Sequence, residues 1–99
     1  MYIYNITINI DNEVREAWIT WMKSTHMPAV MNTGCFIENR LFKVLVDEEQ
    51  GSTYSVQYTF ESMNNLQDYK SNHAAELQNK LNENFGNSLV SFSTVLEKV

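Results

Sequence analysis

The strict alternation of apolar and polar side chains in residues 53–61 restricts the fold of this chain more than any other feature. The apolar members occupy every second position: Tyr54, Val56, Tyr58 and Phe60. Side chains of a β-strand point alternately to the two faces of a sheet, so this run predicts a strand with one buried and one exposed face. Residues 2–10 and 88–97 alternate in the same way. We therefore expect a sheet that needs a cover on one face.

The segment after residue 10 carries apolar side chains at helical spacing. Asp11 or Asn12 can cap this helix at its N-terminus. Pro28 removes a backbone donor and disfavours helical geometry at the preceding residue, so the helix should break or kink near His26. Gly34 can adopt the left-handed conformation that ends the helical region. The large apolar face consists of Val14, Ala17, Trp18, Trp21, Met22 and Thr25.

A second helix is expected between residues 62 and 86. Ser62 can cap its start, and Gly86 can end it. Its apolar face follows a period of about 3.6 residues. The members of this face are Leu66, Tyr69, His73, Leu77, Leu81 and Phe85.

Residues 35–47 predict a long strand with apolar side chains on both faces. Ile37, Leu41 and Leu45 share one face, and Phe36, Phe42 and Val44 share the other. The acidic segment 47–52 should close a hairpin to the next strand. An exposed apolar edge strand is usually covered, and a second subunit is the simplest cover.

The predicted order of elements is βαββαβ in a single domain of residues 1–99. This order matches the ferredoxin-like α+β fold, a four-stranded antiparallel sheet with two helices on one face. We expect the helices to pack on Ile6, Ile8, Tyr58 and Phe92. The open face should be polar and carry Asn5, Thr7, Ser55, Gln57, Ser91 and Ser93.

The charge pattern argues against two classes of partner. The formal net charge is -5, and the seven basic residues are scattered along the chain. Binding to a phosphate backbone requires a basic stripe, so neither nucleic acid nor an anionic membrane surface is an expected partner. No segment approaches the roughly 20 apolar residues that span a bilayer.

Cysteine usage and the N-terminal residues bear on the compartment. Cys35 is the only cysteine, so the chain cannot form an internal disulfide, which is typical of a reducing compartment. The first residues lack the basic and apolar regions of a secretion signal. We expect a cytoplasmic protein.

The region from Trp18 to Leu41 resembles a family of short bacterial proteins classed as a domain of unknown function. The residues that carry the resemblance are Trp18, Trp21, His26, Pro28, Met31, Thr33, Gly34, Phe36, Arg40 and Leu41. The resemblance extends over nearly the whole chain and implies a dimeric α+β barrel, in which two ferredoxin-like units pack sheet to sheet. That superfamily includes cofactor-independent monooxygenases, haem-degrading enzymes, isomerases and ligand sensors, so the fold does not select a reaction.

The resemblance also implies a homodimer with a cavity in each subunit. The open sheet face and the long second strand would form the dimer contact. The polar open face predicted above departs from the greasy surface of an obligate interface, and it favours a wet one.

Four residues have both a functional and a structural interpretation. His26 could point into a cavity as an acid, base or ligand, or it could contact the last carbonyls of its helix. Trp18 and Trp21 could form the floor of a pocket for a flat aromatic molecule, although core packing is the more common role. Tyr58 shares this ambiguity, because its hydroxyl requires a partner if it is buried.

Arg40, His73 and Cys35 each have two interpretations as well. Arg40 could clamp a carboxylate or pair with Glu38. His73 could be catalytic or a satisfied core histidine. Cys35 has no adjacent base in the sequence, which favours a buried, inert thiol. His26, Cys35 and His73 share no recognised metal-ligand spacing, so no metal and no cofactor are expected.

These features lead to three functional hypotheses. The first is a homodimeric small-molecule binding or sensing module whose site contains Trp18, Trp21, His26, Arg40, Tyr58 and His73. The second is a cofactor-independent enzyme of monooxygenase or isomerase type, with His26 as acid or base and an aromatic substrate. The third is a structural or assembly partner.

Overall fold

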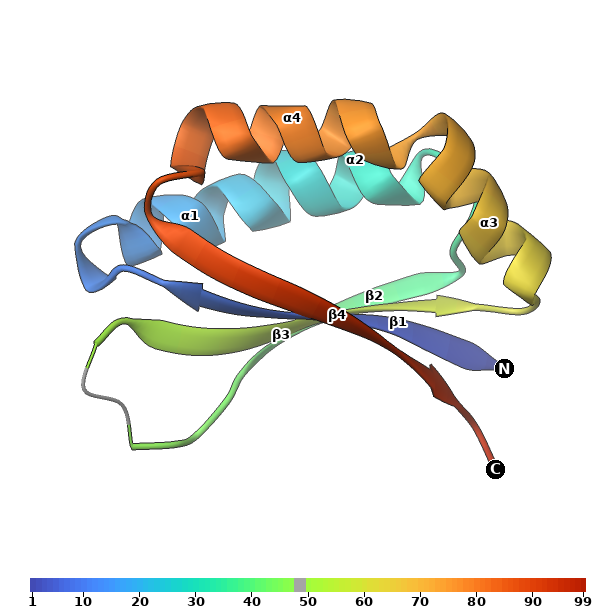
Figure 1. Ribbon diagram of the computed structural model, residues 1–99, viewed down its shortest axis with the longest axis horizontal. Helices are drawn as coiled ribbons and strands as arrows, with labels where there is room; N and C mark the ends of the chain where they lie inside the picture. The colour runs from blue at the N-terminus through green and yellow to red at the C-terminus, as the bar shows by residue number, and fades with distance from the viewer. Residues whose placement is uncertain (48–49) are drawn as a thin grey trace.

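Four strands form one antiparallel sheet in the computed structural model, which describes residues 1–47 and 50–99. The strands lie in the order β2-β3-β1-β4, and the helices lie together on one face (Figure 1). The strands are β1 (Tyr2–Ile10), β2 (Glu38–Lys43), β3 (Ser52–Phe60) and β4 (Leu89–Glu97). The helices are α1 (Arg15–Trp21), α2 (Met27–Met31), α3 (Met63–Asn72) and α4 (Ala74–Phe85). This arrangement confirms the predicted ferredoxin-like fold.

The central strands β1 and β3 supply the floor of the core. Ile8 lies opposite Tyr54 and Ile6 lies opposite Val56, so their side chains share the face that the helices cover. Every second residue of β3 is buried, as the alternation of this segment predicts. Among the residues that the structure describes, no helix combines the length and the apolar character needed to cross a membrane.

The face assignment predicted for the last strand is wrong. Phe92 lies opposite Thr7, and Ser91 lies opposite Ile8. Phe92 therefore projects from the open face and is 64% exposed, whereas Ser91 and Ser93 face the helices. The alternation in 88–97 fixes only the period of two. Which of the two faces meets the helices is decided by the cross-strand register.

Pro28 alters the first helical arm without ending it. Residues Met22–His26 form a π-helical turn between α1 and α2, and the Met27 N–H bonds to the Met22 carbonyl. In an α-helix the proline ring would clash with the carbonyl four residues earlier, and the wider turn avoids that clash. The predicted kink is thus a local widening, and helical geometry continues to Met31. Gly34 then adopts φ +78°, as predicted.

The wider turn changes which side chains enter the core. The buried residues of this arm are Trp18, Met22, Met27 and Val30. The step from Met22 to Met27 is five residues long, one more than the four-residue step that precedes it. Met27 therefore takes the inward position that an uninterrupted α-helix would give to His26.

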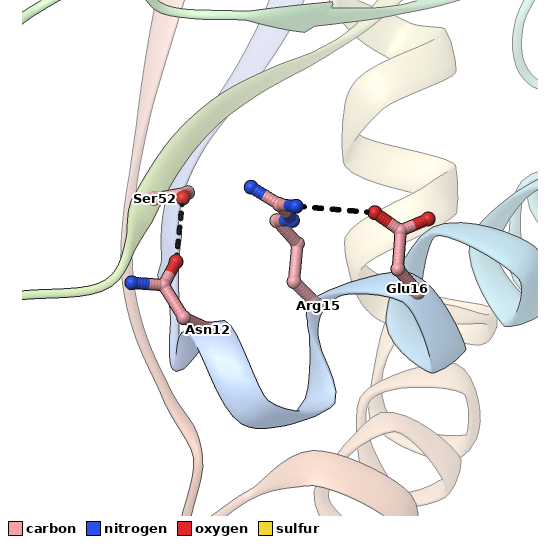
Figure 2. A network of polar contacts seen from close by, with 4 residues as sticks. All are labelled: Asn12, Arg15, Glu16 and Ser52. Carbon is pink, nitrogen blue, oxygen red and sulfur yellow. Dashed lines mark hydrogen bonds and ion pairs between the residues drawn. The ribbon is translucent and has the colours of Figure 1, made fainter.

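The N-terminal turn of this arm is fastened to the sheet by side chains, as Figure 2 shows. Asn12 Oδ1 accepts a hydrogen bond of 2.8 Å from Ser52 Oγ at the start of β3. The Asp11 side chain forms no capping hydrogen bond, and the Asn12 side chain bonds to Ser52 instead. The predicted side-chain cap by Asp11 or Asn12 is therefore absent among the described residues. Arg15 pairs with Glu16 at 3.3 Å on the solvent side.

The second helical arm is two helices, not the single helix predicted. His73 separates α3 from α4 with φ -130° and ψ -35°. The break follows Ser71 and Asn72, which with His73 form a run of three poor helix formers. At the start of α3, the Ser62 N–H donates to Asn65 Oδ1 at 3.1 Å. The arm ends at Phe85, before Gly86, as predicted.

The strand predicted for residues 35–47 is shorter in the structure. β2 begins at Glu38, because Cys35 and Phe36 turn into the core before it. The ring of Phe36 packs 5.2 Å from Tyr58 and 5.0 Å from Tyr69, centroid to centroid. β2 lies at the edge of the sheet, and Leu45 beyond it is 88% exposed. Glu48 and Glu49 of the predicted acidic loop lie outside the described residues.

Candidate functional site

A small cavity lies between the sheet and the helical arms. Its volume is about 70 Å³, and it is bounded by β1, β3, β4, the π-turn, α3 and α4. Half of the lining residues are apolar, and the other half, which carry groups that can form hydrogen bonds, come from six different elements. These polar lining residues are Tyr4, His26, Tyr58, Tyr69, Gln78 and Ser91.

His26 reaches the cavity from the end of the π-turn. Its imidazole stacks on Trp21 with ring centroids 5.1 Å apart and planes at 25°. Burial lowers the pKa of His26 from its ordinary value of 6.5, because the cationic form loses hydration. The imidazole is therefore neutral at neutral pH. A neutral imidazole has one donor and one acceptor nitrogen, so it can bind a ligand or accept a proton.

Tyr58 has a buried hydroxyl without a partner. The residue is 2% exposed, and its hydroxyl forms no hydrogen bond within residues 1–47 and 50–99. Burial strongly raises the pKa of Tyr58, with smaller contributions from Tyr69 and Tyr4. The hydroxyl therefore keeps its proton and can donate a hydrogen bond. An unsatisfied buried polar group costs about 1–3 kcal/mol, so a ligand or water that bonds to it would gain that energy.

Tyr69 and Tyr4 complete an aromatic wall. Their rings lie 6.2 Å apart, and Phe36 contacts both. Burial raises the pKa of Tyr69 to about 12, with Tyr4 contributing. The hydroxyl of Tyr69 therefore keeps its proton at physiological pH.

The structure brings together only some of the predicted site residues. His26 and Tyr58 line the cavity. Trp21 is not a lining residue, but its ring stacks on the imidazole of His26. Trp18 is fully buried and packs on Tyr54 at 5.2 Å, so it belongs to the core. The other two residues lie elsewhere.

Arg40 and His73 do not line the cavity. Arg40 lies on the open face of β2 opposite Gln57 and pairs with Glu38, which is the structural alternative considered for it. The two residues lie two positions apart on one strand, so they share a face. His73 lies at the break between α3 and α4, where its imidazole approaches Cys35 and Asp68. The helical period predicted that His73 lies on the apolar face of the second helix. The break at His73 interrupts that face, so the side chain does not point into the core.

Four polar lining residues were missed from the sequence. Tyr69 was assigned to the apolar face of the second helix, with a hydroxyl that would need a partner if buried, and Tyr4 lies among the apolar positions of residues 2–10. Neither was included in the predicted site. Gln78 follows Ala74 by four residues and precedes Leu81 by three, so this exposed polar residue shares their side of α4. That pattern was a usable signal. Ser91 was missed because its strand was assigned to the wrong face.

The open face of the sheet has a polar centre and apolar margins. Ser55 donates to Asn5, which donates to Thr94 at 3.3 Å. The centre is therefore polar as predicted. The edge strands add large exposed apolar side chains on the same face: Phe42 from β2, and Val90, Phe92 and Leu96 from β4.

With this geometry established, comparisons with known proteins give the family. The model of a domain of unknown function, DUF4286, matches residues 1–99. The chain belongs to the DUF4286 family. None of the curated proteins is detectably similar to the chain in sequence.

Solved structures share the fold of this DUF4286 domain at low sequence identity. HapK from Hahella chejuensis has a TM-score of 0.75 at 9% identity, covering 100% of this chain and 93% of its own. A MhuD variant with two manganese protoporphyrin IX molecules per active site has a TM-score of 0.74 at 15% identity, covering 100% and 95%. A dimeric ferredoxin-like protein from an uncultured marine organism has a TM-score of 0.68 at 14% identity, covering 100% and 95%.

Proposed function

We propose that this DUF4286 domain is a homodimeric small-molecule binding or sensing module. The observation that carries the proposal is Tyr58, whose buried hydroxyl has no partner among the described residues and which lines a partly apolar cavity together with the neutral imidazole of His26. Ligand sites in proteins are mostly apolar concavities with a few convergent polar groups. This cavity likewise combines apolar walls with convergent polar groups.

The cavity volume restricts the ligand. At about 70 Å³, it is well below the roughly 300–1,000 Å³ of sites for drug-sized ligands. A ring-sized molecule enters only if lining side chains move. Met22 is the best candidate, since an unbranched thioether side chain adapts readily. The donor hydroxyl of Tyr58 selects a neutral ligand with a hydrogen-bond acceptor, and the aromatic wall favours a planar one.

The homodimer would form through the open face of the sheet. Phe42, Val90, Phe92 and Leu96 are large apolar side chains that water otherwise covers, and they surround a polar centre. The neighbour described above shares the fold and is described as dimeric, which supports a homodimer. A second copy of the sheet would bury both margins. We also place the protein in the cytoplasm, which its single reduced cysteine supports.

The binding proposal is tested by a fragment titration followed by nuclear magnetic resonance of the backbone amides. The probes are phenol and a small panel of neutral planar carbonyl compounds. Binding should shift the amides around His26, Tyr58 and Gln78. Tyr58→Phe should weaken binding by about tenfold, the equivalent of one buried hydrogen bond. Tyr54→Phe is the matched control and should bind normally.

Two results would contradict the binding proposal. One is the absence of any amide shift with the whole panel. The other is a set of shifts confined to the convex surface of the helices, away from the cavity.

A cofactor-independent enzyme is the second candidate, and the environment of His26 favours it. An imidazole that burial keeps neutral at the edge of a cavity can act as a general base. His26→Ala separates the two candidates once a ligand is known. An enzyme would lose turnover while still binding its substrate, whereas a binding module has no turnover to lose and changes only in affinity.

A further inference from the structure

Three potential metal ligands from different segments meet outside the cavity. Cys35 follows Gly34 and is buried, Asp68 lies on the exposed side of α3, and His73 lies at the break before α4. One ligand atom from each of these side chains lies within 4.8 Å of the other two. Cys35 Sγ also donates a hydrogen bond of 3.3 Å to Asp68 Oδ2.

The neighbouring contacts orient the carboxylate and the imidazole toward this point. Asn72 Nδ2 donates to Asp68 Oδ1 at 2.6 Å, which leaves Oδ2 for the thiol. The ring of His73 stacks on Tyr69 at 6.5 Å with planes at 27°. Supporting contacts of this kind hold ligands in place around protein metal sites.

We propose that Cys35, Asp68 and His73 bind a divalent cation of the zinc type, with water as the fourth ligand. Sulfur, imidazole nitrogen and carboxylate oxygen are the donors that zinc accepts. Three protein ligands and one open position are the usual composition of a reactive zinc site, and the exposed side of Asp68 gives solvent access to this position.

In the metal-free protein, the Cys35 thiol proton lies between Sγ and Asp68 Oδ2, where the cation would bind. On binding, the Sγ–H bond breaks, the proton passes to solvent, and a metal–sulfur bond forms. Ligand atoms around a tetrahedral zinc lie about 3.5 Å apart, given metal–ligand bonds of about 2.0–2.3 Å. The present Sγ–Oδ2 distance of 3.3 Å already fits that spacing. Metal binding would therefore mainly require the imidazole of His73 to move closer to the other two ligand atoms. His73 lies at a helix break, where such a movement is easiest.

This site is independent of the proposed cavity function. Neither Cys35, Asp68 nor His73 lines the cavity, and His26 lies outside this cluster. A bound cation would connect the loop before β2 to the junction of α3 and α4. Failure of ligand binding in the cavity would therefore leave this proposal unchanged.

Cobalt(II) is the probe for the test, because it occupies zinc sites and absorbs light when thiolate is bound. The metal-free full chain is titrated with Co²⁺ in the presence of a thiol-free reductant. We expect a near-ultraviolet sulfur-to-cobalt band that one equivalent of Zn²⁺ removes. Cys35→Ser should abolish the band, and His73→Gln should weaken Co²⁺ binding by at least about tenfold. His26→Gln is the matched control, since it changes the only other histidine, and it should retain the band.

A second measurement keeps the test decisive if Cys35→Ser folds poorly. Asn72→Ala leaves all three ligands in place and removes the contact that orients Asp68. It should weaken Co²⁺ binding by about tenfold, as loss of a supporting partner usually does. The proposal is overturned if the unmodified protein gives no band at millimolar Co²⁺, or if the band persists in a folded Cys35→Ser protein.

Discussion

The imidazole of His26 stacks on the indole of Trp21 at the edge of the cavity. The centroids of the His26 and Trp21 rings lie 5.1 Å apart. On α4, the ring of Phe85 packs against the Trp21 ring with centroids 5.6 Å apart. The π-turn that accommodates Pro28 sets this position, because it places Met27 inward and leaves His26 at the edge of the cavity. The backbone requirement of Pro28 thus contributes to the position of His26, and burial at that position lowers the pKa of the imidazole.

The pH dependence of stability should reveal this burial. The pKa of His26 lies below 6.5 in the folded state, so as the pH falls below about 6.5 the unfolded chain binds a proton first. The free energy of unfolding should therefore decrease as the pH falls from 6.5 toward the folded pKa. Urea titrations from pH 8 to pH 5 measure this decrease, and His26→Gln should lack it. Parallel curves for the two proteins would contradict the assigned burial.

Tyr58→Phe should stabilise the ligand-free protein. The substitution removes a buried hydroxyl that has no partner among the described residues and leaves the ring in place. We expect the free energy of unfolding to rise by about 1 kcal/mol, measured in urea. Tyr54→Phe is the control, because the Tyr54 hydroxyl is not among the buried oxygens found without a partner in the described residues. This variant should show no increase in the free energy of unfolding. Destabilisation by Tyr58→Phe would indicate a bonded hydroxyl.

The two tryptophans should differ in their contribution to stability. Trp18 is fully buried against Tyr54, so Trp18→Ala should cost about 3–5 kcal/mol. Trp21 is partly exposed, and Trp21→Ala should cost about 1–2 kcal/mol. Chemical denaturation of both variants gives the comparison. Equal losses would contradict the division between a core residue and a cavity-edge residue.

Phe92→Glu should weaken the proposed dimer. Phe92 projects from the open face, where a carboxylate would be desolvated by a second sheet. Sedimentation velocity should show a dimer for the unmodified chain and a monomer for the variant at the same concentration. Asn79→Glu adds the same charge at an exposed position of α4, and it should leave the dimer intact. An unmodified chain that stays monomeric at high concentration would remove the dimer proposal.

The proximity of Cys35, Asp68 and His73 could not be predicted from their spacing in the sequence. The absence of a recognised ligand spacing led to the expectation of no metal site. Asp68 lies 33 positions from Cys35, yet their side chains meet because α3 packs beside the loop that precedes β2. Proximity of this kind depends on long-range packing, and no local pattern encodes it.

The sequence by itself determined the order of the elements and the inward faces of β1 and β3. Alternation and helical periodicity are local properties of the backbone, so they can be read without knowing any distant contact. Only the tertiary structure decided the outward face of β4, the break at His73 and the cavity between Tyr58 and His26. These features depend on strand register and on how the two helical arms pack, and both are fixed by contacts between residues far apart in the chain.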